Sequence, residues 1–164
     1  MEASLLTPRC TLVPSHFFAP ERARDLLGEV VTLSGGEDIR YLEVPQYDAV
    51  LIYAADSGTD SGESAAVPPE LFFVLRDLPS CREYNKILAS WREGWLYLGI
   101  AQGGSLLLCN AYEAPDFTTA EYYLFLAMKS LQLNPEVSTV CWRSPVGPDE
   151  EMSLYRYFKS VEQL

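Results

Sequence analysis

The chain has 164 residues, of which 48% are hydrophobic and 12% aromatic, and its 23 acidic and 12 basic residues give a net charge of −11. This length and composition predict one globular domain, or slightly more, and exclude a fully disordered chain. The acidic balance argues against nucleic acids and anionic membrane surfaces as partners, because both attract clusters of Lys and Arg.

The N-terminal third predicts a small antiparallel sheet with one helix. Residues 9–13 predict a strand, and a helix beginning at Pro20 is predicted by one apolar face that comprises Ala23, Leu26, Leu27 and Val30. Residues 39–44 alternate apolar and polar side chains, which is typical of a half-buried strand. Residues 49–55 are continuously apolar and predict a more central strand, paired antiparallel with the one before it.

Residues 55–69 differ in composition from the chain on either side of them. They are rich in Gly, Ser, Asp and Thr and offer almost nothing to bury, so we expect a flexible acidic surface loop. The acidic side chains lack the regular ligand spacing and the closing Glu of a calcium loop.

The remainder of the chain alternates between predicted helices and strands. The elements expected are a helix over 69–77, a helix over 85–93 that ends at Gly94, a strand hairpin over 95–101 and 105–113, a helix over 118–133, a strand over 137–142 and a helix over 149–161. In the helix over 118–133 one apolar face comprises Ala120, Tyr123, Leu124, Ala127, Met128 and Leu131. Thr118 and Glu121 have the spacing of a capping box, and Asn134 followed by Pro135 predicts the end of that helix. Strands mixed with helices in this order predict an α/β or α+β fold with a mixed sheet.

Cysteine and histidine usage limits the chemistry available. The cysteines stand at 10, 81, 109 and 141, and His16 is the one histidine. No cysteine pair has the CxxC spacing, so we expect reduced thiols and no zinc site. Nucleophilic catalysis would need a base beside a Ser or Cys, but we expect His16 to be structural, because the segment Ser15-His16-Phe17-Phe18 can equally place it at a helix entrance near the two phenylalanines. The N-terminus lacks the pattern of a secretory signal and no run approaches the ~20 apolar residues of a membrane span, which favours a cytoplasmic protein.

An ordered set of short segments resembles a known family. These segments are TLVPS at 11–15 with Phe17-Phe18, NAY at 110–112, YYL at 122–124 and LQLNP at 131–135. Over most of its length the chain is similar to domain of unknown function 3822, a bacterial family with an actin-like ATPase fold. The resemblance implies an α/β mixed sheet of the actin-like, ribonuclease H-like group. Family members are longer and begin with a further N-terminal sheet segment, so we expect a fold that is incomplete relative to the full two-domain arrangement: a single actin-like domain over 1–164, or a partial pair of subdomains.

The turn between the two hairpin strands is the candidate nucleotide site. Gln102, Gly103, Gly104 and Ser105 form this turn, and actin-like ATPases hold phosphates with backbone N–H groups in glycine-containing hairpin turns. No carboxylate stands in the turn to organise magnesium, and neither GxxxxGK[ST] nor GxGxxG occurs. ATP with Mg²⁺ is therefore a cofactor only if this turn binds nucleotide; we otherwise expect no cofactor, no catalytic residue and no metal site.

Two other functional hypotheses concern the acidic residues of the strands and the aromatic residues of the last two helices. Glu43, Asp48 and Glu113 are too few for a two-metal RNA-processing nuclease, and we expect Glu43 and Glu113 at strand ends or facing solvent. The last two predicted helices carry more aromatic side chains than one core requires: Tyr122, Tyr123, Phe125, Tyr155, Tyr157 and Phe158. Tyr122 and Phe125 lie beside the buried face of their helix; in the last helix Tyr157 and Phe158 lie on the buried face, with Leu154 and Val161, and Tyr155 lies off it. Exposed aromatics favour a protein partner or a homodimer. The first hypothesis is a non-catalytic interaction scaffold on a degenerate actin-like ATPase fold; the alternative is a nucleotide-binding protein or ATPase.

Overall fold

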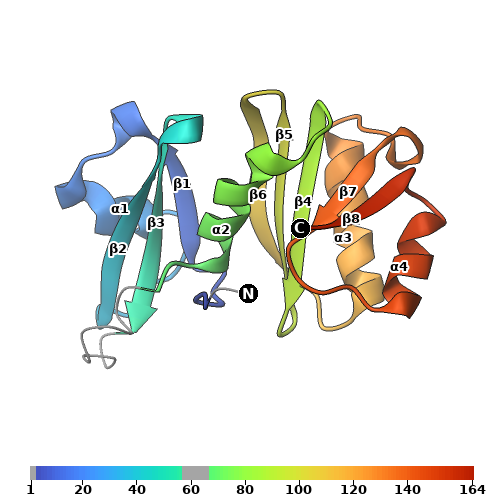
Figure 1. The fold of residues 1–164 in the computed structure, drawn as a ribbon. Helices are drawn as coiled ribbons and strands as arrows, with labels where there is room; N and C mark the ends of the chain where they lie inside the picture. The colour runs from blue at the N-terminus through green and yellow to red at the C-terminus, as the bar shows by residue number, and fades with distance from the viewer. Residues whose placement is uncertain (1–2, 57–66) are drawn as a thin grey trace. The chain divides into compact units, whose positions relative to one another are not determined.

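The computed structural model describes residues 3–56 and 67–164, which belong to two compact units, Met1–Phe73 and Val74–Leu164 (Figure 1). Most of the predicted acidic loop, residues 57–66, lies outside the described residues. In the part of the chain that is described, no helix is both long and apolar enough to cross a membrane.

The first unit is built on a three-stranded antiparallel sheet. Its strands are β1 (Cys10–Pro14), β2 (Glu37–Val44) and β3 (Ala49–Asp56), in the order β1-β3-β2. The continuously apolar segment is the central strand, as predicted, because a central strand buries side chains on both faces. Short 3₁₀ turns, η1 (Ser15–Phe17), η2 (Pro20–Arg22) and η3 (Pro45–Tyr47), connect these elements.

Helix α1 (Ala23–Gly28) closes the core of this unit. Its buried residues Ala23 and Leu27 belong to one apolar cluster with Val50 and Ile52 of β3. Val30, predicted on the buried face, is 61% exposed because the helix ends at Gly28. Helix α2 (Glu70–Asp77), at the predicted place, contains the boundary between the two units.

The second unit contains a five-stranded mixed sheet. Its strands are β4 (Asn85–Arg92), β5 (Trp95–Gln102), β6 (Ser105–Glu113), β7 (Thr139–Trp142) and β8 (Ser160–Gln163), in the order β6-β5-β4-β7-β8. Strands β4 to β6 form an antiparallel meander, whereas β7 lies parallel to β4 and β8 parallel to β7. A meander followed by two parallel strands, each reached through a helix, is the mixed α/β arrangement that the family resemblance implied.

Two helices accompany this sheet, α3 (Phe117–Ser130) and α4 (Pro148–Tyr155), with short 3₁₀ turns at η5 (Leu78–Ser80) and η6 (Pro135–Val137). The apolar stripe predicted for α3 is buried at Ala120, Leu124, Ala127 and Met128. These side chains share one core with Ile100 of β5 and Trp142 of β7, and Trp142 is 1% exposed. The helix is therefore held by burial of one face against the sheet.

Two predicted elements are wrong. Residues 85–92 form the strand β4 and not a helix: the strand pairs with β5 and β7, and Ile87, Leu88, Ala89 and Ser90 are all fully buried, so both faces of the strand are covered. Residues 149–161 do not form one helix: α4 ends at Tyr155, and the chain returns as β8 at the edge of the sheet. In β8, Val161 pairs with Val140 of β7 and packs against the core.

The ends of α3 also differ from prediction. Asp116 is the N-cap, and its carboxylate accepts hydrogen bonds from the backbone N–H and the hydroxyl of Thr119, each at 2.8 Å. Glu121 makes no capping box, because its side chain is buried and accepts a hydrogen bond from Ser153 of α4. After the helix, Gln132 adopts the left-handed conformation with φ +59°. Asn134 instead caps η6, accepting a hydrogen bond from the Glu136 N–H.

Candidate functional site

The predicted nucleotide turn connects β5 to β6 and is closed by bonds within the protein. The Gly103 N–H donates to the carbonyl of Tyr84 at 2.9 Å, and the Gln102 side-chain amide donates to Asn85 Oδ1 at 2.9 Å. Gly103 has φ +55°, and a Cβ there would lie 3.1 Å from the Tyr84 ring. Gln102 pairs with Ser105 across the turn, with Gly104 between Gly103 and Ser105. A phosphate that used the Gly103 amide would have to displace the bond to Tyr84.

The acidic residues singled out from the sequence do not form one cluster. Glu43 and Asp48 are exposed in the first unit, and Glu113 is exposed at the end of β6 in the second. Within the described ranges, no group of three or more His, Cys, Asp or Glu side chains has an arrangement that could hold a metal ion. His16 is exposed, with its ring centroid 4.3 Å from that of Phe17.

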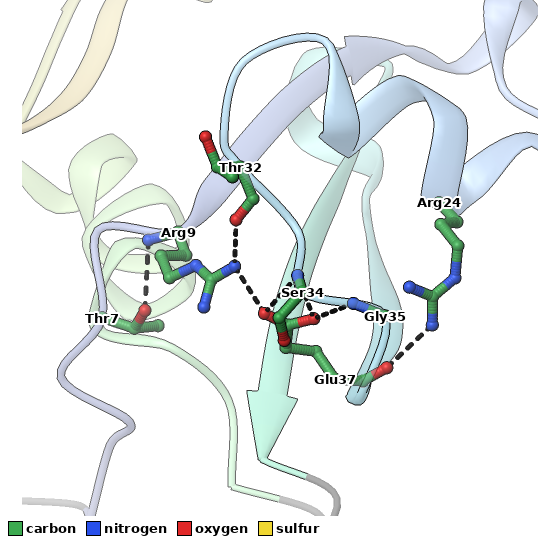
Figure 2. A network of polar contacts seen from close by, with 7 residues as sticks. All are labelled: Thr7, Arg9, Arg24, Thr32, Ser34, Gly35 and Glu37. Atoms are coloured by element: carbon green, nitrogen blue, oxygen red, sulfur yellow. Dashed lines mark hydrogen bonds and ion pairs between the residues drawn. The ribbon is translucent and has the colours of Figure 1, made fainter.

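Glu37, at the start of β2, organises a polar network in the first unit (Figure 2). Its carboxylate accepts hydrogen bonds from the N–H groups of Ser34 and Gly35 and lies 2.8 Å from Arg9 Nη2. The backbone hydrogen bond from Ser34, followed by the contact with Arg9, lowers the pKa of Glu37 to about 2. Arg9 also donates to the Thr32 carbonyl, so these contacts fix the turn that leads into β2. Both carboxylate oxygens already accept hydrogen bonds, which makes this network structural.

A groove of about 540 Å³ lies where α3 ends and the chain leaves α4. We call it the α3/α4 groove, and its lining comprises Phe125, Lys129, Gln132, Leu133, Asn134, Pro135, Glu136, Arg156 and Tyr157. The Phe125 ring centroid lies 4.9 Å from that of Tyr157 and 5.7 Å from that of the buried Phe158. The aromatic side chains of the groove are therefore packed against one another and supported by the core.

Two cations of this groove have no close partner among the residues that the structure describes. Neither Lys129 Nζ nor the Arg156 guanidinium makes a hydrogen bond or an ion pair within 4 Å to any residue that the structure describes. By contrast, Lys159 lies 2.8 Å from Glu83, and Arg82 lies 2.6 Å from Glu162.

Glu136 is an acid on the lining, and the buried Glu121 is close enough for the charge of Arg156 to affect it. Burial raises the pKa of Glu121, against the opposing effects of its hydrogen bond with Ser153 and the charge of Arg156. The lining itself carries two cations and one anion.

Large side chains are exposed on the same two helices. Tyr122 and Leu126 of α3 are 59% and 46% exposed, and Met152 and Tyr155 of α4 are 62% and 49% exposed. The prediction of exposed Tyr122 and Tyr155 is confirmed, whereas Tyr157, predicted on the buried face, is 47% exposed because the helix ends before it.

The remaining aromatics are more covered than Tyr122 and Tyr155. Tyr123 stacks on Tyr112 of β6 with ring centroids 5.0 Å apart. Phe125 is half-buried and Phe158 is 4% exposed.

Sequence reasoning missed Lys129 and Arg156. A signal existed for the first, because Lys129 follows Phe125 by four residues and so shares its helix face. No comparable signal existed for Arg156. Residues 156–158 were predicted inside the last helix, but α4 ends at Tyr155, and the positions of these residues depend on how β8 joins the sheet.

Comparisons with known proteins agree with this architecture. The model of a family described as "Protein of unknown function (DUF3822)" matches residues 71–161, which is more than half of the chain. A crystal structure from Bacteroides thetaiotaomicron, described as a protein with actin-like ATPase fold and unknown function, aligns with a TM-score of 0.79 and 20% sequence identity. The alignment covers 97% of this chain and 66% of that one, so the chain spans about two thirds of the length of that protein. No curated protein matches. The chain belongs to the DUF3822 family of proteins of unknown function, and its fold is that of the actin-like ATPases.

Proposed function

We propose that this protein is a non-catalytic interaction module on an actin-like ATPase fold, and that the α3/α4 groove binds a segment of a partner protein. The observation that carries the proposal is the presence, in one groove, of two aromatic rings in contact and two cations that no described residue engages at close range. Side chains of this kind supply much of the binding energy in protein interfaces, where Tyr and Arg are enriched.

The chemistry of the groove selects a partner segment with an apolar anchor and acidic flanks. Phe125 and Tyr157 offer the surface on which an apolar side chain would be buried. Lys129 and Arg156 would meet carboxylates, while Glu136 on the lining would disfavour a second acid close to it. On a chain with a net charge of −11, a lining with an excess of cations is a local exception.

The β5–β6 turn supports the non-catalytic part of the proposal. Its four residues carry no carboxylate, and the Gly103 N–H is bonded to Tyr84. Phosphoryl transfer depends on bound metal ions that neutralise the developing charge, together with backbone groups free to hold phosphate.

Peptide binding tests the groove. The probes are a fluorescein-labelled peptide with a Leu-Phe centre between acidic residues and its charge-reversed counterpart with lysines, measured by fluorescence anisotropy. We expect the acidic peptide to bind, and both Lys129→Glu and Arg156→Glu to weaken it by about fivefold or more, the scale of an exposed ion pair that is lost and replaced by repulsion. Binding should also weaken as salt increases.

Arg22→Glu is the matched control. Arg22 is an exposed cation on η2 of the first unit, so this variant changes the net charge equally without touching the groove. An equal loss of peptide affinity in all three variants would show a general charge effect and would contradict peptide binding in the groove. Tighter binding of the lysine peptide than of the acidic peptide would contradict it too.

A homodimer is the other form of interaction that the exposed aromatics favour. Light scattering of the full chain over a range of concentrations would detect it. If Tyr122→Ser abolished the dimer and Lys129→Glu still formed it, the interface would lie on the exposed helix surface outside the groove, because Tyr122 is not among the lining residues.

The alternative function, a nucleotide-binding protein or ATPase, is favoured by the fold of the Bacteroides thetaiotaomicron structure. In this case Gln102, Gly103, Gly104 and Ser105 would hold the phosphates of Mg-ATP. Ligand at a hundred times its dissociation constant stabilises a protein by about 2.7 kcal/mol, which a thermal melt resolves. No rise in Tm at millimolar Mg-ATP would favour the interaction module, and a rise that Gly104→Val abolishes would favour the nucleotide site.

A further inference from the structure

Helices α3 and α4 lie on one face of the sheet of the second unit (Figure 1). Strands β6, β7 and β8 all run in the same direction, because β5 is antiparallel to both β4 and β6 while β7 is parallel to β4 and to β8. Each helix connects two of these parallel strands, so both helices run opposite to the strands and in the same direction as each other. Leu124 of α3 and Leu154 of α4 are buried in the same core, which places both helices on one face.

Three exposed residues of α4 share one side of the helix. Asp149, Met152 and Arg156 are spaced by three and four residues, and the backbone of Arg156, the C-cap, is still helical. Met152 is 62% exposed. Neither Asp149 nor Arg156 forms an ion pair with a residue in the described ranges. These three residues, which we call the α4 stripe, place an acid near one end of the helix, an apolar side chain in the middle and a base at the other end.

The α4 stripe is complementary to itself. Asp149 and Arg156 are seven residues apart, which is about 10 Å along a helix, and Met152 lies close to the midpoint. When two copies of α4 lie antiparallel about a two-fold axis perpendicular to them, Asp149 of each copy faces Arg156 of the other, and the two Met152 side chains meet at the axis. A parallel arrangement would place like charges together. The same three residues, used twice, therefore suffice for a closed dimer.

Helix α3 adds exposed apolar surface on the same side of the sheet. Tyr122 is 59% exposed, and its ring makes an edge contact with that of Tyr123, with the centroids 5.3 Å apart. Tyr123 is in turn stacked on Tyr112 of β6. These contacts restrict the Tyr122 ring before any partner binds, which lowers the entropy cost of burying it in an interface.

We propose that the α4 stripe is the centre of an interface with a second copy of this chain, in which antiparallel α4 helices pair Asp149 of one copy with Arg156 of the other. A net charge of −11 opposes self-association, so a contact between copies has to bring opposite charges together. The α4 stripe does so twice. Arg156 also lines the α3/α4 groove, so a second copy and an acidic peptide compete for it, but this interface does not require the groove to bind peptide.

An exchange of charges between two variants tests the interface on the full chain. In Arg156→Glu the new carboxylate faces Asp149 of the other copy, and in Asp149→Lys the new ammonium faces Arg156. Each variant alone has two repulsive contacts, so we expect its dimer dissociation constant, measured by sedimentation velocity, to rise about tenfold or more. A mixture of the two variants restores two attractive pairs, one native and one reversed. Native mass spectrometry of the mixture should therefore show the heterodimer as the main dimer.

Glu151→Lys is the matched control. Glu151 is exposed in the first turn of α4, as Asp149 is, but it lies two residues further on and so off the α4 stripe. This variant changes the charge equally and should leave the dimer intact. Met152→Asp should abolish the dimer, because two carboxylates would meet at the axis. A thermal melt shows whether each variant is folded, and Asp149→Asn, which only removes the charge, should weaken the dimer by a smaller factor than Asp149→Lys.

Three results would overturn the proposal. They are a wild-type chain that stays monomeric up to millimolar concentration, an equal loss of the dimer in Glu151→Lys and Asp149→Lys, and a mixture of Arg156→Glu and Asp149→Lys without the heterodimer. A wild-type monomer that binds the acidic peptide would leave the proposed function standing. A monomeric Met152→Asp chain that binds no acidic peptide would remove the proposed function and leave this interface standing.

Discussion

Gly99 gives the sharpest test of how the second unit is packed. It lies in the buried middle of β5, and a Cβ at this position would stand 3.0 Å from Val74 Cγ1 and 3.3 Å from Leu78 Cδ2. Both neighbours are fully buried. The change Gly99→Ala therefore inserts a methyl group where neither neighbour has room to move.

The magnitude follows from two opposing effects. Overpacking a well-packed core costs about 1–3 kcal/mol. Replacing Gly by Ala restricts the unfolded chain and returns about 0.4–1 kcal/mol. Because the two contacts come from buried side chains, we expect the steric effect to win and the free energy of unfolding to fall by about 1–2 kcal/mol, from these same figures.

Urea denaturation followed by tryptophan fluorescence measures this change. Trp91, Trp95 and Trp142 all lie in the second unit, so the signal reports on that unit. The fall should appear as a lower midpoint with an unchanged slope. Val74→Ala, which removes the methyl group that the new Cβ would meet, should cost less in the Gly99→Ala chain than in the wild type.

Gly104→Ala is the matched control, because a Cβ there meets nothing within 4 Å and its φ lies outside the left-handed region. It should change stability by about 0.5 kcal/mol or less, as surface substitutions do. Equal effects of Gly99→Ala and Gly104→Ala, or additive effects of Gly99→Ala and Val74→Ala, would refute the packing of α2 and η5 on β5.

Three further predictions follow from local geometry. The pKa of Glu37 is lowered from 4.5 to about 2, so its ionised carboxylate stabilises the folded state at pH values above about 4.5, and this stabilisation is lost as the pH falls from about 4.5 to 2. Glu37→Gln should therefore lower the free energy of unfolding at neutral pH and make it depend less on pH between 4.5 and 2. Urea denaturation at each pH measures both effects. Asp116→Ala should lower Tm because the Thr119 N–H loses its acceptor, whereas Thr118→Ala should leave it nearly unchanged; equal effects would restore Thr118 as the cap. Gly103→Ala should destabilise by about 1 kcal/mol or more, because alanine is strained at φ +55° and would press on the Tyr84 ring, and a neutral result in a thermal melt would mean that the turn relaxes.

Several features of the molecule were decided by the order of residues along the chain. The alternation of residues 39–44 and the apolar run of 49–55 were enough to predict two antiparallel strands, with the second in the centre of its sheet. The hairpin over 95–113 and the buried stripe of α3 were equally local, because a strand or helix face shows in the spacing of apolar residues. The family resemblance extended these elements to the actin-like fold.

Other features were decided only when the chain folded on itself. Residues 85–92 form β4, which pairs with β5 and β7, and its middle residues are buried on both faces of the sheet, which removes the alternation that distinguishes a strand from a helix. Glu121 was predicted in a capping box from its spacing to Thr118, yet its partner, Ser153, is brought to it by α4. The α3/α4 groove depends on the same long-range pairing, since β8 fixes where Arg156 and Tyr157 leave α4. The spacing of apolar residues along one element predicts which face of it is buried. Contacts between elements far apart in sequence depend on tertiary packing, which no local sequence pattern predicts.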